Sequence, residues 1–171
     1  MKTLVIYSSV TGNTEKIVKA AYDEIPFPKK ICKSLNKLSL KNYELIIIGY
    51  WVDKGICDSR NVEIIKNIHN KKVIFMGTLG AKDNGNYYES IKKRVESFLP
   101  EDNKLIDHFL CQGRINEKLI ERYKTIFESN PGDENIKRQL ENAKIASTHP
   151  DNTDLNNVKE FIKNIFKKIE F

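Results

Sequence analysis

Hydrophobic positions along the chain alternate between short apolar runs and helical stripes. The first run covers residues 2–7, and a polar turn follows at residues 8–13. Beyond this turn, Ile17, Val18 and Ala21 have the spacing of one face of a helix. The pattern therefore predicts a strand, a loop and a helix, in this order.

The same alternation continues through the first two thirds of the chain. Residues 44–49 and 72–76 contain the apolar runs Leu45–Ile48 and Val73–Met76, which are typical of strands that are covered on both faces in a parallel sheet. Residues 30–33 predict an edge strand and residues 104–111 a last strand, while Asp58 is predicted to cap the helix after the third strand. Strands that alternate with helices favour an α/β class, doubly wound five-stranded parallel sheet with the order 2-1-3-4-5.

The last third of the chain departs from a minimal fold of this kind. Two helical stripes consist of Leu119, Ile120, Tyr123, Ile126 and Phe127 and of Ile136, Leu140 and Ala143. They predict an inserted helical pair over residues 115–150, before a long amphipathic last helix that Asp151 caps. No linker surrounds the insertion, so we expect one domain over residues 1–171 in which the pair packs on the main body.

The composition limits the classes of protein to consider. A chain of 171 residues with 40% hydrophobic content is enough for one buried core. The longest apolar run, residues 45–52, is far shorter than the roughly 20 residues that cross a bilayer. The amino-terminal residues lack the pattern of a secretory signal. We therefore expect a cytoplasmic protein with no membrane partner.

Charge, cysteines and histidines add little further chemistry. The net charge of +6 is spread along the chain as lysines, without an arginine-rich arm, so we expect a solvated surface and no nucleic-acid partner. Cys32, Cys57 and Cys111 are odd in number and form no C-x-x-C pair, which favours reduced structural thiols. The three histidines do not lie at metal-binding spacing, so no metal site is predicted.

The loop at residues 9–14 has the composition of a phosphate site. A phosphate monoester needs converging hydrogen-bond donors, and the first turn of a helix supplies unpaired N–H groups. Ser9, Thr11 and Thr14 add hydroxyl groups, and Gly12 lets the backbone close around an anion. An ordinary strand-to-helix turn prefers the same residue types, and it is the alternative.

Other nucleotide-binding and catalytic motifs are missing from the sequence. There is no G-x-x-x-x-G-K-[ST] and no G-x-G-x-x-G after the first strand, which argues against ATP and NAD. There is also no G-x-S-x-G elbow or nucleophile and base pair, so no catalytic residue is assigned.

The sequence around the phosphate loop resembles a known signature. Residues 7–16 read Tyr-Ser-Ser-Val-Thr-Gly-Asn-Thr-Glu-Lys and are similar to the FMN phosphate signature of the flavodoxin family. The strand and helix pattern extends the resemblance over most of residues 1–114 and over residues 151–171. The resemblance implies non-covalently bound FMN, with the flavin ring at the carboxyl edge of the sheet between the loops after the third and fourth strands.

The resemblance and the composition of these loops together assign a set of residues to the cofactor. They are Ser8, Ser9, Val10, Thr11, Gly12, Asn13 and Thr14 at the phosphate and Tyr50, Trp51, Val52, Asp53, Thr78, Leu79, Gly80 and Tyr88 at the ring.

Two predicted loops, residues 50–57 and 77–86, would hold the flavin ring. The first contains Trp51, the only tryptophan, which could stack on the ring, although a core or surface tryptophan is the alternative. The second has glycines that let the backbone approach a flat ring, and Tyr87 or Tyr88 could stack on the other face. A simple tight turn is the alternative for this loop.

The sequence departs from the family in the first of these loops. Many flavodoxins carry Trp-Gly-Asp there, and the glycine peptide turns over to bond the one-electron-reduced flavin. Val52 takes this place here and resists positive φ, which implies weaker stabilisation of that form. Counted from Gly49, Gly55 is instead the residue that turns against the ring, and both registers stay open. Lys54 is either a solvated side chain or a cation that raises the flavin potential.

The resemblance also indicates a partner. Residues 109–114, 121–123 and 149–151 are similar to a subgroup of bacterial flavodoxin-like proteins, some of which are encoded beside reductases of bilirubin. We therefore expect an electron carrier that works with a partner redox protein, such as a tetrapyrrole or bilirubin reductase. One alternative is a flavin enzyme of the same fold, of the quinone reductase or protoporphyrinogen oxidase type, with the helical pair shaping its pocket. The other alternative is a flavin-free binding module.

Overall fold

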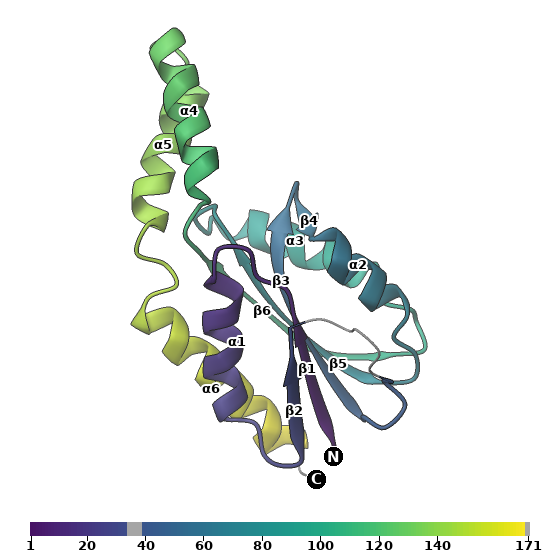
Figure 1. The fold of residues 1–171 in the computed structure, drawn as a ribbon. Coiled ribbons are helices and arrows are strands. Elements are labelled where there is room, and N and C mark those ends of the chain that lie inside the picture. The colour runs from purple at the N-terminus through teal and green to yellow at the C-terminus, as the bar shows by residue number, and fades with distance from the viewer. Residues whose placement is uncertain (34–38, 170–171) are drawn as a thin grey trace.

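The computed structural model describes residues 1–33 and 39–169 and has a sheet with helices on both faces (Figure 1). Its five long strands are β1 (Thr3–Tyr7), β2 (Lys29–Cys32), β3 (Leu45–Asp53), β5 (Lys72–Leu79) and β6 (Lys104–Gln112). They pair in parallel in the order β2-β1-β3-β5-β6. Counted over these strands, this is the predicted order 2-1-3-4-5, and the α/β fold class is confirmed.

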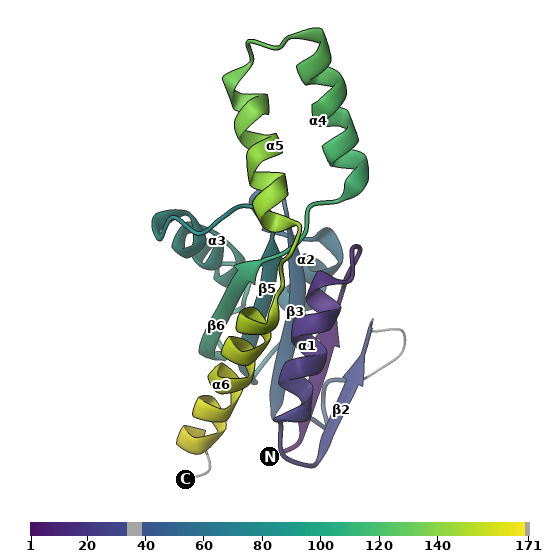
Figure 2. The same cartoon turned by 90° about the vertical axis from the view of Figure 1, so that its left-hand side faces the viewer.

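Helices cover the two faces of the sheet and form two layers of core. The helices α1 (Asn13–Asp23) and α6 (Asn152–Ile169) lie side by side on one face (Figure 2). The helices α2 (Ser59–Lys66) and α3 (Asn86–Glu96) lie on the other (Figure 1). In β3 the side chains of Ile46 and Ile47 enter opposite layers, because successive strand residues point to opposite faces. The unbroken apolar run therefore marks a central strand, as predicted.

Two of the predicted loops begin later than expected, because the strands continue into them. Tyr50 and Trp51 of β3 pair with Gly77 and Thr78 of β5, so both strands extend beyond their apolar runs. The end of β3 then pairs antiparallel with the short strand β4 (Ile56–Cys57). The sequence of either strand alone does not reveal this pairing, because the residues with which it pairs are distant in the chain.

The predicted helical pair is present as α4 (Glu117–Ser129) and α5 (Glu134–Ala146), but its position differs from the expectation. Instead of packing along the main body, the pair projects from the carboxyl edge of the sheet as a helical arm (Figures 1 and 2). No residue of α4 is buried, and the buried residues of α5 are Ala143 and Ala146, at its base. The two helices pack mainly against each other rather than against the sheet. Within the described part of the chain, no helix is long and apolar enough to cross a bilayer.

A buried histidine links the sheet to α3. The hydroxyl of Tyr50 lies 2.7 Å from Nε2 of His108, and Nδ1 of His108 lies 2.8 Å from Oε1 of Glu96. These partners fit a neutral ring that donates from Nδ1 to the carboxylate and accepts from the tyrosine at Nε2. Burial lowers the pKa of His108 below its usual value, although Glu96 opposes the shift.

We expect the free energy of unfolding to decrease as the pH falls through about 6.5, the pKa of an unfolded histidine. The pKa of His108 is lower in the folded state, so the unfolded chain binds the proton first and is favoured by acid. Urea unfolding at about pH 7.5 and pH 5.5 measures this effect. The variant His108→Gln keeps a donor and an acceptor but does not titrate, so its stability should change less over this interval. An equal change in both proteins would contradict the assignment.

Candidate functional site

A cavity of about 500 Å³ lies at the carboxyl edge of the sheet. This is within the size range of small-molecule and cofactor sites, and the edge is where open α/β sheets bind ligands. Its walls come from the loop after β1, the hairpin of β3 and β4, the end of β5, the segment after β6 and the base of the helical arm. Several of these segments are far apart in the sequence.

The loop after β1 has the geometry of an anion site. Helix α1 begins at Asn13, and its N-cap residue Gly12 has φ 87°, a left-handed conformation that glycine adopts without strain. Because Gly12 has no side chain, it caps none of the first N–H groups of α1, but the N–H of Glu15 donates to Oγ of Ser9 (3.3 Å). Val10, Thr11 and Asn13 line the cavity, as expected. These residues fit a phosphate group at the positive end of a helix.

Two hydroxyl groups of this loop are used inside the protein rather than facing the cavity. Ser8 donates to Oδ2 of Asp58 (2.7 Å) and accepts from Nδ2 of Asn61 (2.8 Å). Thr14, only 1% exposed, donates to the carbonyl of Tyr50 (3.3 Å) and lies 2.9 Å from the hydroxyl of Thr78. The expectation that Ser8 and Thr14 face the cofactor is therefore corrected. The two side chains instead fasten the loop to neighbouring elements. Asp58, to which Ser8 donates, caps α2 as predicted.

The hairpin after β3 forms another wall of the cavity. Trp51, Val52 and Asp53 line it, as expected, and Lys54 and Gly55 join them. Lys54 and Gly55 have φ 49° and 84°, the conformation of a two-residue hairpin turn. Val52 lies within the ladder, paired with Cys57. The residues that turn with positive φ are therefore Lys54 and Gly55 rather than Val52, which favours the register counted from Gly49.

Two of the expected tyrosines lie in the core instead of the cavity. Tyr50 precedes Trp51 in a strand, so the two side chains point to opposite faces, and Tyr50 is buried against His108. Tyr88 is buried as well, and its hydroxyl donates to the carbonyl of Ala81 (2.9 Å). Burial raises the pKa of Tyr88. Tyr87, one position earlier in α3 and so turned by about 100°, lines the cavity in its place.

The end of β5 and the segment after it form the third wall of the cavity. Thr78, Leu79 and Gly80 line the cavity, as predicted, and Ala81 extends this wall. The sequence interpretation did not assign the residues that follow β6 or those of the arm: Arg114, Ile115, Asn116, Leu119, Tyr123, Gln139 and Asn142. The sequence did contain one signal for the position of these residues. The insertion follows the last predicted strand, so it begins at the edge of the sheet where the cofactor loops meet.

The arm holds one wall of the cavity through hydrogen bonds from α5. Nδ2 of Asn142 donates to the carbonyl of Gly80 (2.9 Å), and Oδ1 of Asn142 accepts from the N–H of Lys82 (3.2 Å). Nε2 of Gln112, at the end of β6, also donates to the carbonyl of Gly80 (3.0 Å). The segment after β5 is thus fixed by side chains from both sides.

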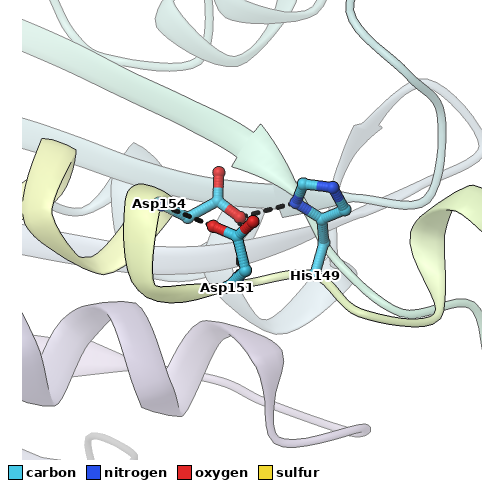
Figure 3. A group of neighbouring side chains, drawn as sticks. All are labelled: His149, Asp151 and Asp154. Atoms are coloured by element: carbon cyan, nitrogen blue, oxygen red, sulfur yellow. Dashed lines mark hydrogen bonds and ion pairs between the residues drawn. The ribbon is translucent and has the colours of Figure 1, made fainter.

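A group of polar side chains at the start of α6 has a structural explanation. His149, Asp151 and Asp154 place possible ligand atoms within 4.8 Å of one another (Figure 3). Oδ2 of Asp154 accepts from Nδ1 of His149 (2.6 Å) and from the N–H of Asp151 (2.8 Å). Oδ1 of Asp151 accepts from the N–H of Asp154 (3.0 Å), which confirms Asp151 as the cap. The three residues therefore form a reciprocal cap of the last helix.

The substitution Asn142→Ala should loosen the segment after β5. It removes the donor to Gly80 and the acceptor for Lys82, contacts worth about 1 kcal/mol each. We expect faster amide hydrogen exchange of residues 80–82, measured by mass spectrometry. The matched control is Gln139→Ala, which also changes a cavity residue of α5. Equal exchange in the two variants would show that the arm does not order this segment.

Comparison with known proteins agrees with the geometry. A profile of the family described as "Flavodoxin domain" matches residues 4–163. The chain is 43% identical over 173 residues to a flavodoxin-like domain-containing protein BilS of Clostridioides difficile (strain CD3), with 98% of each chain covered. It is 30% identical to a protein of the same name from Clostridium symbiosum (strain WAL-14163), with 95% of this chain and 94% of that protein covered.

Solved structures show the same fold. Oxidised Flavodoxin 2 from Bacillus cereus has a TM-score of 0.56 at 15% identity, covering 99% of this chain and 100% of that one. A flavoprotein in complex with FMN from Lactobacillus acidophilus NCFM has a TM-score of 0.51 at 17% identity, covering 64% of this chain and 92% of that one. At such low identity the structures show the fold alone, whereas the profile and the two relatives show the family. The chain therefore belongs to the flavodoxin family of FMN-binding proteins.

Proposed function

We propose that this protein holds FMN in the cavity at the carboxyl edge and exchanges electrons with a partner oxidoreductase. One observation carries the proposal. The start of α1, with Thr11 and Asn13 in the wall, and the aromatic side chains of Trp51 and Tyr87 border the same cavity of about 500 Å³. A phosphate group and a flat ring of one ligand can therefore be bound together.

The residues of the chain have separate tasks in this site. The N–H groups of the first turn of α1 and the hydroxyls of Ser9 and Thr11 would hold the phosphate. Trp51 and Tyr87 offer aromatic surface to the ring, and Leu79 helps to exclude water from it. FMN supplies reversible electron uptake when bound.

The composition of the cavity wall favours an electron carrier over a stand-alone enzyme. Among the described residues that line the cavity, none is a histidine or a cysteine, and Asp53 is the single carboxylate. Proton transfer to a substrate would thus have few side chains to use. We infer the kind of partner from the resemblance of residues 109–114, 121–123 and 149–151. It indicates a reductase, such as a tetrapyrrole or bilirubin reductase.

A flavin enzyme of the same fold is the second candidate, and one observation favours it. The arm adds Leu119 and Tyr123 to the cavity wall, where a quinone or a tetrapyrrole could contact them. Oxidation of NAD(P)H by the pure FMN-loaded protein with a soluble quinone would favour the enzyme. For a carrier, we expect this reaction to be slow and to accelerate when a flavin reductase is added. Stopped-flow absorbance at the flavin band measures both rates.

FMN binding is tested by titration of the flavin-free protein. We expect one FMN per chain, measured from the quenching of flavin fluorescence and the change in the visible spectrum. The double variant Ser9→Ala and Thr11→Ala should bind at least about tenfold more weakly, because each hydroxyl lost is a hydrogen bond to a charged group. Thr125→Ala, which changes an exposed hydroxyl of α4, is the control. A protein that takes up no FMN would contradict the proposal and favour a flavin-free binding module.

A further inference from the structure

We propose that Arg114 recognises the phosphate of FMN, and that it thereby makes the site select FMN over riboflavin. The inference rests on the proposed function, since it concerns the same cavity. It concerns the segment that leads from β6 into the arm, which the sequence interpretation did not assign to the cofactor.

Arg114 is held directly beside the start of α1. Its carbonyl accepts from Nδ2 of Asn13 (2.8 Å), the first residue of that helix. The preceding residue, Gly113, packs so closely that a Cβ atom there would lie 2.7 Å from Nδ2 of Asn13. On the other side, the N–H of Arg114 donates to the carbonyl of His149 (2.8 Å). The backbone of Arg114 is thus fixed between the phosphate loop and the cap of α6, and the residue lines the cavity.

The phosphate loop by itself offers few donors and no positive side chain. Residues 8–14 contain no lysine or arginine. The hydroxyls of Ser8 and Thr14 are engaged within the protein. Oγ of Ser9 accepts from the N–H of Glu15 (3.3 Å), so this hydroxyl and that of Thr11 are left as donors. A phosphate monoester carries a charge of about −1.5 to −2 near pH 7 and has three strong acceptor oxygens. A neighbouring cation would therefore add both charge and donors.

Arg114 is the cation in the right place. The described wall of the cavity contains two cationic side chains, Lys54 and Arg114. Lys54 lies in the turn between β3 and β4, on the side of Trp51, whereas the backbone carbonyl of Arg114 is bound to Asn13, at the start of α1. A guanidinium group also presents a planar set of donors that matches phosphate oxygens in pairs.

The guanidinium group is free to turn towards a ligand. Its side chain is 50% exposed, and its contact with Glu117 is long, 3.9 Å, on a side chain that is itself 81% exposed. Such a surface pair contributes little and competes weakly with a doubly charged phosphate. Another carboxylate near the start of α1, that of Glu15, is paired with Lys19 (2.6 Å) and Lys33 (3.5 Å) rather than with Arg114.

The test compares FMN with riboflavin, which has the same ring but no phosphate. Both flavins are titrated into the flavin-free wild type, Arg114→Gln and Arg114→Lys, with Kd measured from fluorescence quenching. We expect Arg114→Gln to weaken FMN binding about tenfold or more and to leave riboflavin binding unchanged. Arg114→Lys should recover part of the loss, because it restores the charge but not the planar donors. FMN binding should also depend more steeply on salt in the wild type than in Arg114→Gln.

The matched control is Arg122→Gln, which removes an exposed arginine of α4 that is not part of the cavity wall. It should change neither Kd. An equal loss of FMN and riboflavin in Arg114→Gln would overturn the inference, because the residue would then act on the ring or on the fold. Unchanged FMN binding would overturn it as well. A wild type that binds neither flavin would instead contradict the proposed function.

Discussion

Parallel pairing makes the five long strands of this sheet end at one edge, and the site depends on this constraint. The loop after β1, the hairpin after β3, the end of β5 and the segment after β6 all meet there. The buried apolar runs of the central strands hold these ends in fixed positions, so that elements far apart in the sequence share one cavity. The same constraint explains why the helical arm contributes to the site, since it is inserted at this edge (Figure 1).

The phosphate loop is held in place by hydrogen bonds within the protein. Ser8 is bound to the cap of α2 and Thr14 to β3 and β5, so the loop is fastened on two sides. A loop that is already ordered loses less conformational entropy when a ligand binds. Two hydroxyl groups that would otherwise serve as ligand donors are used for this purpose. Some hydroxyl residues of this loop therefore hold it in position, while others are left to contact a ligand.

Much of the fold could be predicted from local patterns, and much of the site could not. Apolar runs, helical stripes and caps such as Asp58 and Asp151 depend on neighbouring residues, so the sheet order and the helices were predicted correctly. The extension of β3 beyond Gly49 depends on pairing with β5, which is distant in the sequence. The choice between Tyr87 and Tyr88 depends on the rotation of one helix against the sheet. An apolar stripe also does not show whether it packs on the sheet or on another helix. For this reason the predicted position of the helical pair was wrong.

The tie between Arg114 and His149 has a consequence for how the protein is made. The phosphate loop is synthesised long before His149 and the helix that follows it. One side of the cavity thus stays without its support until those residues have been made. A nascent chain that stops short of His149 has the loop but not the finished pocket.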